Sequence, residues 1–400
     1  MNMDAKKNGP LYQLQYEENP CLLWDTKRLF SLIPKTKSRQ EVQFGAGVEA
    51  FVFQSAPYGE KLETWTFAAM GTPSTPKPLD GYPAVVLIHG GDGYVFGEWI
   101  AHWTKRGFVA IAVDMFGNQL NEKLEKVANP DGGHPEYHGS NFDSVETPEQ
   151  SWVYHSVYNV IMAHNLLRNR ADVDSRRIAL TGISWGGYVT SIVAGVDHRF
   201  AAFAPTYGCG FVYDDGFWTN GNGSFGDGNL QKWVDLYDPS SYLPYAVKPT
   251  LFVSGIDDPF FSVVNRMKSA GLIKGKAFYS QRADLPHGHC WDLTHEIESF
   301  FRHVLYGENT YATICECVVN DGVATLKTDG KPRGLATFVY TDSTDQDSHK
   351  WTWNKAAVCD GGNASCVIPD GATAYFFERA WEEDGLPVYQ TTPVYFVGKK

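Results

Sequence analysis

The 400-residue sequence contains no stretch of 18 consecutive apolar residues, which is about the length that a membrane-spanning helix needs. Its longest apolar runs, 84–88 and 109–113, have the length of strands. Residues 1–8 carry Lys6 and Lys7 but no apolar segment, so we expect no signal peptide in the given chain. We therefore expect no membrane partner. A cytoplasmic location is favoured, and a periplasmic or secreted one stays open if a signal was removed.

Positive charge and cysteine are both scarce. Lysine and arginine number 34 against 46 acidic residues, and the net charge of -12 is spread along the chain. This charge would repel a partner rich in phosphate, so we expect no nucleic-acid binding. Four of the seven cysteines gather near the C-terminus, at Cys315, Cys317, Cys359 and Cys366. Their Cys-x-Cys spacing lacks the two-residue gap of common zinc sites, so reduced thiols are favoured over one or two disulfides.

The overall composition is typical of a globular protein, and the sequence shows a regular alternation of strand-like and helical patterns. Hydrophobic residues make up 43% and charged residues 20% of the sequence, close to the globular average. Strand-like runs and amphipathic helical patterns follow one another: strands at 84–88, 109–113, 178–181 and 251–254, and helices at 96–103, 147–168, 188–194 and 293–305. This alternation predicts an α/β fold with a mostly parallel central sheet, whose catalytic residues lie at the carboxyl ends of the strands.

From about Tyr311 the pattern changes to short alternating runs separated by glycine-rich turns, at 323–327, 335–340, 350–353, 374–377 and 394–397. Strands at this spacing predict a small antiparallel β-sandwich. We therefore expect three parts: an N-terminal extension packed on the catalytic domain at 1–80, the catalytic domain at 81–307 with an insertion or lid at about 208–245, and the sandwich at 308–400.

The strongest chemical motif is Gly182-Ile183-Ser184-Trp185-Gly186-Gly187, which directly follows a strand-like run and opens an apolar helical pattern. A nucleophile elbow has this arrangement, because its serine sits on a tight strand-to-helix turn where flanking side chains must be small. We predict Ser184 as a nucleophile.

A serine nucleophile needs a histidine base and an acid that orients it, in the chain order Ser, Asp, His. The run 251–254 ends in Gly255-Ile256-Asp257-Asp258, and Asp258 is preferred over Asp257 as the acid. The following loop contains His287-Gly288-His289, where His289 is preferred over His287 as the base. The histidine that is not the base is expected to give a supporting hydrogen bond or to be an ordinary loop residue. A metal site at this pair is disfavoured, because no third ligand pattern lies nearby.

The oxyanion of an acyl-transfer intermediate needs hydrogen-bond donors. His89-Gly90-Gly91 follows the first buried strand, as the corresponding loops of lipases and esterases do. We predict the N–H groups of Gly91 and Trp185 as the oxyanion hole, with Gly90 or Asp92 as alternatives to Gly91.

Two further features are open to more than one interpretation. The segment 220–229, rich in Asn and Gly, is expected to be a lid loop rather than a cation site, because it lacks the spaced carboxylates of an EF-hand. In the expected sandwich, Trp351, Trp353 and Trp381 could stack on sugar rings, but packing or dimerisation is the favoured role.

These motifs resemble the α/β-hydrolase superfamily over about 82–306. Within it, the sequence is similar to the bacterial carbohydrate-esterase-like group, whose members are described as acetylxylan esterases or dienelactone-hydrolase-like proteins. The similarity is carried by His89-Gly90-Gly91-Asp92-Gly93, Glu98-Trp99, Arg106-Gly107-Phe108, Asp114, Gly182 to Gly187, Tyr207-Gly208-Cys209-Gly210 and Gly255 to Asp258. A C-terminal β-sandwich also resembles that group. Position 184 is serine and not the cysteine of a dienelactone hydrolase proper, so lactone opening is not the expected chemistry.

The resemblance implies ester hydrolysis. We expect a serine carboxylesterase acting on short acyl esters, above all acetyl esters of xylan or other plant-polysaccharide oligosaccharides, without a cofactor. Its partner would be a small-molecule or saccharide ester, and a homodimer stays open. One alternative is a serine peptidase of the prolyl-oligopeptidase type, for which the roughly 80 upstream residues are too few to form the usual propeller. The other is a non-catalytic glycan-binding protein.

Overall fold

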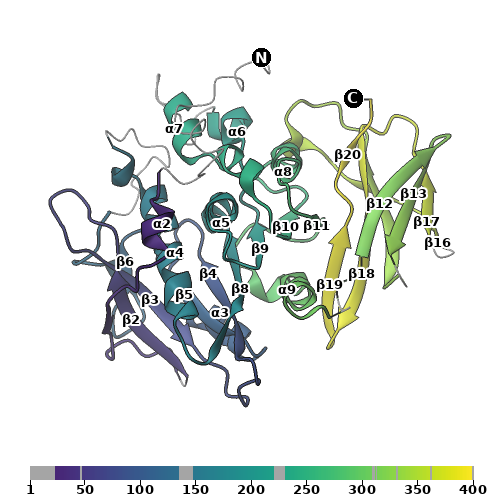
Figure 1. Cartoon of the computed structure of the whole chain (residues 1–400). Helices are drawn as coiled ribbons and strands as arrows, with labels where there is room; N and C mark the ends of the chain where they lie inside the picture. The colour runs from purple at the N-terminus through teal and green to yellow at the C-terminus, as the bar shows by residue number, and fades with distance from the viewer. Residues whose placement is uncertain are drawn as a thin grey trace.

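The structure is a computed structural model of the 400-residue chain (Figure 1). It describes residues 23–45, 47–134, 147–219, 230–308, 311, 313–329, 332–360 and 363–398. The predicted lid loop 220–229 lies outside the described residues. Among the helices that are described, none has the length and hydrophobicity required to cross a membrane.

Six parallel strands form the centre of a large sheet, in the spatial order β5, β4, β8, β9, β10 and β11. Their bounds are β4 Tyr82–Ile88, β5 Val109–Val113, β8 Val173–Ile183, β9 Ala202–Thr206, β10 Thr250–Gly255 and β11 Ala277–Arg282. All residues of β4, β5, β9 and β10 are buried, which explains their nearly continuous apolar sequences. The predicted strands are therefore confirmed, with β8 longer than its apolar run suggested.

The N-terminal segment extends this sheet. Strands β1 (Thr36–Ser38), β2 (Val48–Gln54) and β3 (Trp65–Gly71) pair antiparallel to one another, and β3 pairs antiparallel to β5. These strands lie at the side of the molecule away from the C-terminal strands (Figure 1). The N-terminal segment is therefore hydrogen-bonded into the same sheet as the central strands.

Helices flank the central strands. The main ones are α3 Gly97–Thr104, α4 Trp152–Arg168, α5 Trp185–Val196, α8 Val263–Ala270 and α9 Glu296–Tyr306. Helices α3 and α9 meet through Trp103 and Phe301, whose ring centroids are 5.6 Å apart. Helix α4 begins at Trp152, five residues later than the start of the predicted helical pattern. The Ser151 side chain caps this helix by accepting a hydrogen bond from Val153 N–H, and a short 3₁₀ turn, η2 (Pro148–Gln150), precedes it.

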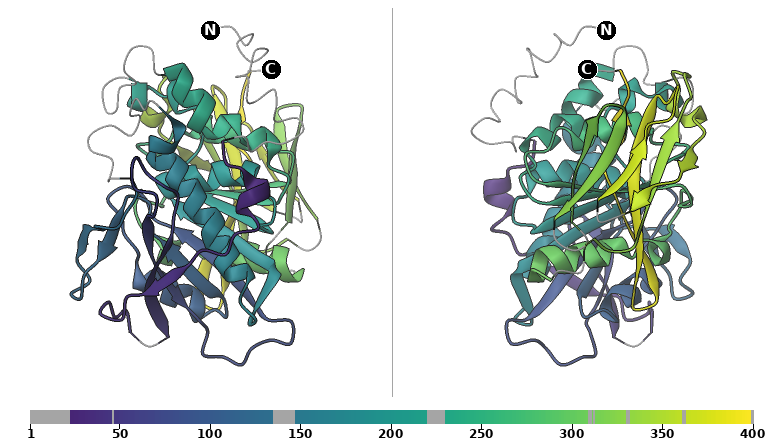
Figure 2. Two further views of the ribbon diagram at one scale, coloured as in Figure 1. Left: turned by 60° about the vertical axis from the view of Figure 1, so that its left-hand side comes forward. Right: turned by 90° about the vertical axis from the view of Figure 1, so that its right-hand side faces the viewer.

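The C-terminal part is the expected antiparallel sandwich, but one of its sheets continues the large central sheet. One sheet contains β14 Leu335–Thr341, β15 Asn354–Ala356, β18 Ala374–Glu383, β19 Leu386–Thr391 and β20 Tyr395–Phe396. The other contains β12 Thr313–Asn320, β13 Val323–Asp329, β16 Cys359–Asp360 and β17 Ala364–Val367. Strand β19 pairs antiparallel with β11 through Tyr279 and Thr391, so it covers the edge of the central sheet. The right-hand view of Figure 2 brings these strands to the front.

One predicted strand of the sandwich is wrong. Residues 350–353 were expected to be extended, but the chain forms a 3₁₀ turn, η7 (Ser348–Lys350), and β15 begins only at Asn354. The Asp347 side chain caps this turn by accepting a hydrogen bond from His349 N–H. A local side-chain contact of this kind competes with strand pairing.

The remaining elements are short. They are α2 Thr26–Leu29, β6 Asn118–Leu120, β7 Lys126–Ala128, η3 Val212–Asp214, α6 Gly216–Thr219, α7 Leu230–Tyr237, η4 Pro239–Ser241, η5 Leu243–Tyr245 and η6 Trp291–Leu293. Those from η3 to η5 belong to the predicted insertion between β9 and β10. The structure gives Cys209, Cys290, Cys317, Cys359 and Cys366 as free thiols.

Candidate active site

Ser184 stands on the predicted tight turn between β8 and α5. Its backbone has φ 57° and ψ -117°, a conformation that a residue with a side chain adopts only when its surroundings enforce it. One source of that constraint is Gly186, where an added Cβ would lie 2.2 Å from the carbonyl oxygen of Ile88 at the end of β4. The neighbours Ile183 and Trp185 are buried while Ser184 is partly exposed. The elbow therefore presents the serine at the carboxyl edge of the sheet.

The side chain beside Ser184 is His287. Its Nε2 lies 2.9 Å from Ser184 Oγ, and its Nδ1 lies 2.6 Å from Asp258 Oδ2. A carboxylate can only accept, so Nδ1 carries the hydrogen and Nε2 accepts from the serine hydroxyl. Ser184, His287 and Asp258 thus form one continuous hydrogen-bonded chain whose polarity suits removal of the serine proton.

Asp258 is buried and well supported. Its Oδ1 accepts hydrogen bonds from the N–H groups of Phe260, at 2.9 Å, and Phe261, at 2.8 Å. Burial acts to raise the pKa of Asp258, but the hydrogen bond from His287 and the nearby charge of Arg266 outweigh it, so the pKa lies below its ordinary value. Asp258 is therefore held as a carboxylate. Asp257, the alternative acid, is exposed.

The preference for His289 over His287 as the residue that contacts Ser184 and Asp258 is corrected by these positions. His289 Nε2 lies 3.0 Å from the N of Gly90, from which it accepts a hydrogen bond. The two histidines stand two positions apart on an irregular loop, so local pattern could not tell which ring turns toward Ser184. Burial and the neighbouring His89 and His287 lower the pKa of His289 to about 4, which keeps its ring neutral and able to accept.

Gly90 is held at its carbonyl oxygen as well as at its N–H. Met115 N–H donates to His89 Nε2 at 3.1 Å, so His89 Nδ1 carries the hydrogen and donates to Gly90 O at 2.8 Å. An added Cβ on Gly90 would lie 2.9 Å from both Ile183 O and Ser184 Cβ, so only glycine allows this approach to the elbow. Since the Gly90 N–H is engaged by His289, it is a poorer oxyanion donor than Gly91. Gly91 and Trp185 remain the predicted donors.

Aromatic rings surround the serine and histidine. The Tyr207 and Phe260 rings lie 4.4 Å and 4.6 Å from the His287 ring, and Trp185 contacts Trp218 of the insertion at 4.9 Å. Tyr207 also donates its hydroxyl to Pro286 O at 2.6 Å, which fixes the histidine loop. Sequence analysis gave Tyr207 no role, although its place directly after β9 is a position where site residues gather.

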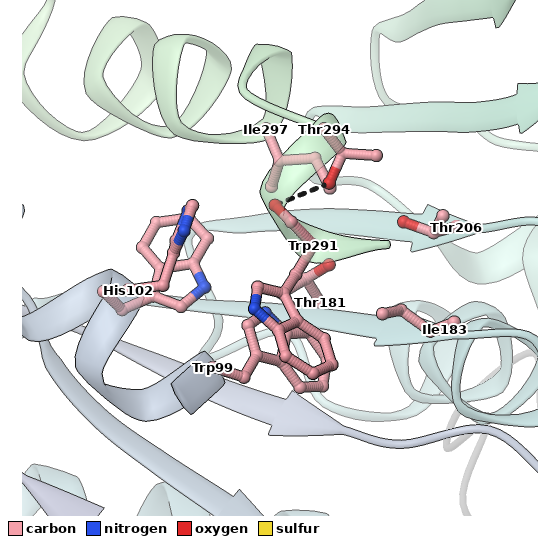
Figure 3. Close-up of a pocket in the computed structure, with 9 residues that line it drawn as sticks. Trp99, His102, Thr181, Ile183, Thr206, Trp291, Thr294 and Ile297 are labelled. Atoms are coloured by element: carbon pink, nitrogen blue, oxygen red, sulfur yellow. Dashed lines mark hydrogen bonds between the residues drawn. The ribbon is translucent and has the colours of Figure 1, made fainter. Parts of the chain in front are cut away.

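A small cavity lies beneath this region, between β8, β9, α3 and α9 (Figure 3). The rings of Trp99 and Trp291 stack in it with centroids 5.6 Å apart, and Thr294 donates a hydrogen bond to Trp291 O. Its volume of about 10 Å³ is room for at most one water molecule. The cavity is a packing feature between sheet and helices and cannot hold an ester substrate.

No cluster of three or more potential metal ligands occurs within the described parts of the chain. Of the paired histidines, His287 is engaged by Ser184 and Asp258, and His289 by Gly90. Neither ring faces a shared ligand position.

Comparisons with known proteins agree with this fold. The family model of acetyl xylan esterase (AXE1) matches residues 64–215, less than half of the chain but including the Gly90 loop and Ser184. The chain is similar in structure to an acetyl xylan esterase from Paenibacillus sp. R4, with a TM-score of 0.55, 16% identity, and 76% of this chain and 100% of that one covered. Acetyl xylan esterase 1 from Thermoanaerobacterium sp. JW/SL YS485 gives a TM-score of 0.52, 14% identity and coverage of 76% and 99%.

No curated protein sequence matches the chain. At such low identities, the structural similarities establish the fold, while the matched family model covers the segment that carries the elbow. Taken with the parallel sheet and the strained Ser184, these findings identify the chain as a serine hydrolase of the α/β-hydrolase fold.

Proposed function

We propose that the protein is a carboxylesterase that uses Ser184 as nucleophile, His287 as general base and Asp258 as the acid that orients the base. The observation that carries this proposal is the hydrogen-bonded chain from Asp258 through His287 to Ser184. Only a neutral Nε2 facing the serine hydroxyl can take its proton during attack. His287, the alternative in the sequence analysis, replaces His289 in this role.

The reaction follows from these positions. Ser184 Oγ forms a bond to the ester carbonyl carbon while its proton passes to His287 Nε2, and the carbonyl oxygen becomes an oxyanion. The C–O bond to the leaving alcohol then breaks as His287 returns the proton to that alcohol. Water, deprotonated by the same Nε2, attacks the acyl-enzyme, and the acid product leaves with Ser184 restored. Asp258 stays ionised and stabilises the imidazolium that forms twice in each cycle.

We assign the oxyanion to the N–H groups of Trp185 and Gly91. Trp185 is the first residue of α5, so its N–H lies at a helix N-terminus, where the helix dipole favours negative charge. His89 and His289 hold the Gly90 peptide at both ends and so set the direction of the next N–H, that of Gly91. Preorganised donors of this kind stabilise the transition state without reorganisation.

Acetyl esters of plant polysaccharides, xylan above all, are the substrate class that we propose. The support is the match of residues 64–215 to the acetyl xylan esterase family model. The crowding of aromatic rings around His287 and Trp185 favours a short acyl group over a long one.

The test is pre-steady-state kinetics with 4-nitrophenyl acetate, followed by a panel of longer acyl esters, acetylated xylan, acetylated xylo-oligosaccharides and an aminoacyl 4-nitroanilide. We expect a burst of one nitrophenol per enzyme, faster turnover of acetyl than of longer esters, and release of acetate from the acetylated oligosaccharides. Ser184→Ala should abolish the burst while the far-ultraviolet circular dichroism stays unchanged. Undiminished turnover in Ser184→Ala, or cleavage of the anilide in preference to every ester, would overturn the proposal.

A further inference from the structure

His349, on the turn η7 of the C-terminal sandwich, reaches across to the loop that carries Asp258. Its Nδ1 lies 2.8 Å from the backbone oxygen of Asp258, and its Nε2 lies 2.9 Å from Asp215 Oδ1. The His349 side chain is 13% exposed and that of Asp215 is 2% exposed, so the pair is largely shielded from water. A residue 91 positions further along the chain thus contacts the backbone of the candidate catalytic acid.

Both partners of His349 are acceptors. A carbonyl oxygen and a carboxylate have no hydrogen to give, so each ring nitrogen must donate, and only the imidazolium form carries two hydrogens. Burial acts to lower the pKa of His349, but the hydrogen bond and charge of Asp215 and the Asp258 carbonyl raise it above its ordinary value. Burial likewise acts to raise the pKa of Asp215, and His349 reverses this so that it lies below the ordinary value.

Asp215 in turn contacts the far end of the loop that begins at Asp258. Its Oδ2 accepts hydrogen bonds from Ser262 N–H, at 3.2 Å, and from the Asn265 side chain, at 3.4 Å. The acid loop from Asp258 to Ser262 is therefore held directly by His349 at its beginning and through Asp215 at its end. Phe260, which packs on the His287 ring, lies between these two points.

Near His349, the sandwich and the catalytic part also share a buried hydrophobic cluster. Trp351 of the sandwich belongs to one buried cluster with Ile256 and Val263, which flank the acid loop. This cluster places η7 against the catalytic part through apolar contacts that do not titrate. The charged groups around His349 are Asp215 from the insertion and Asp347 from its own turn, with Arg266 of α8 behind Asp215 and Asp258.

We propose that His349 is a positioning residue of the active site, through which the C-terminal sandwich fixes the acid loop in the place that catalysis needs. The inference rests on the proposed function and assigns the sandwich a catalytic role in place of the glycan binding, packing or dimerisation considered from sequence. Because the Asp258 carboxylate must orient the His287 ring, a displaced acid loop lowers the rate of the chemical step more than it weakens substrate binding.

The experiment measures kcat and KM for 4-nitrophenyl acetate as a function of pH in the full chain. In His349→Phe, which keeps a ring but no donors, we expect kcat to fall about 10-fold or more and KM to change less than about 3-fold. His349→Gln keeps one donor that does not titrate and should recover part of kcat. Lys350→Ala, an exposed neighbour on the same turn, should match the wild type.

The pH profile separates positioning from mere stability. In the wild type, kcat should decline toward high pH as the His349 imidazolium loses its proton and one of its two hydrogen bonds. Asp215→Asn removes the carboxylate that favours the charged ring, so this decline should begin at lower pH. In His349→Gln the decline attributable to this group should disappear, at temperatures where circular dichroism shows each variant folded.

The outcomes distinguish the inference from the proposed function. A wild type without ester turnover contradicts the proposed function itself. A wild type with turnover whose kcat profile is unchanged in His349→Gln and Asp215→Asn overturns the role of His349 and leaves the esterase proposal standing. If His349→Phe does not fold, the profiles of the other two variants decide.

Discussion

His289 Nε2 accepts a hydrogen bond from Gly90 N–H at 3.0 Å, across 199 positions of sequence. The contact ties the histidine loop to the loop after β4, directly beside the elbow. It assigns the two neighbouring histidines different tasks: His287 faces Ser184, and His289 faces the loop expected to bind the oxyanion.

The contact with Gly90 requires only that the side chain at position 289 accept a hydrogen bond from the Gly90 N–H, and it does not require a base. His289→Gln offers a side-chain oxygen that can accept the same hydrogen bond, whereas His289→Leu cannot. We expect kcat/KM to fall less than about 5-fold in the glutamine variant and by about 10- to 100-fold in the leucine variant, because a displaced Gly91 N–H stabilises the oxyanion less well. Steady-state kinetics on 4-nitrophenyl acetate measures both. Equal losses in the two variants would contradict this role.

His289 should also affect how the free energy of unfolding changes at acid pH. In the folded protein the pKa of His289 is about 4, below the ordinary value of 6.5. Between pH 4 and pH 6.5, this side chain is therefore protonated in the unfolded chain but neutral in the folded one. This group's contribution to the free energy of unfolding is therefore full above pH 6.5 and declines as the pH falls toward 4. Urea denaturation should show a shallower decline over this window in His289→Gln than in the wild type. Identical slopes would count against a buried neutral ring.

Substitution of the adjacent residues Asp257 and Asp258 should have very different effects on kcat. Asp258→Asn leaves the shape intact but removes the charge that orients His287 and stabilises its protonated form, so we expect kcat to fall by about 10⁴-fold. The matched control Asp257→Asn, at an exposed side chain, should change kcat less than about 3-fold. The assignment of the acid fails if the two variants lose similar activity.

The elbow depends on Gly186. An added Cβ would meet backbone, 2.2 Å from Ile88 O and 2.5 Å from His89 O, so Gly186→Ala must displace the end of β4. We expect a loss of about 2 kcal/mol or more in the free energy of unfolding, measured by urea denaturation, together with a large loss of kcat. Gly271→Ala is the control, because its nearest neighbour is 3.4 Å from the added Cβ, and it should stay within about 0.5 kcal/mol. Similar stabilities would contradict the close packing of the turn.

Local pattern predicted the parts of this molecule whose positions are set locally. Buried parallel strands have continuous apolar sequences, and the elbow glycines form a short motif around Ser184, so both could be found from sequence alone, although the contacts that require Gly186 come from the end of β4. Asp258 followed from the same logic, because the carboxyl end of β10 had to lie near that of β8.

The features that were missed depend on contacts between distant segments. Whether His287 or His289 turns toward Ser184 is decided by Tyr207, which holds Pro286, and by Gly90, which engages His289. The pairing of β11 with β19 and the reach of His349 to Asp258 likewise join segments about 90 to 110 positions apart. Neither has a periodicity or motif that a single sequence displays.

The most direct test of the account compares His287→Ala with His289→Ala, using single-turnover acylation by 4-nitrophenyl acetate at neutral pH. We predict that the acylation rate falls by at least about 10³-fold in His287→Ala, as for loss of a general base in this type of triad. In His289→Ala it should fall by no more than about 10²-fold, as for a weakened oxyanion site. A greater loss in His289→Ala than in His287→Ala would contradict the assignment of the base and the mechanism built on it.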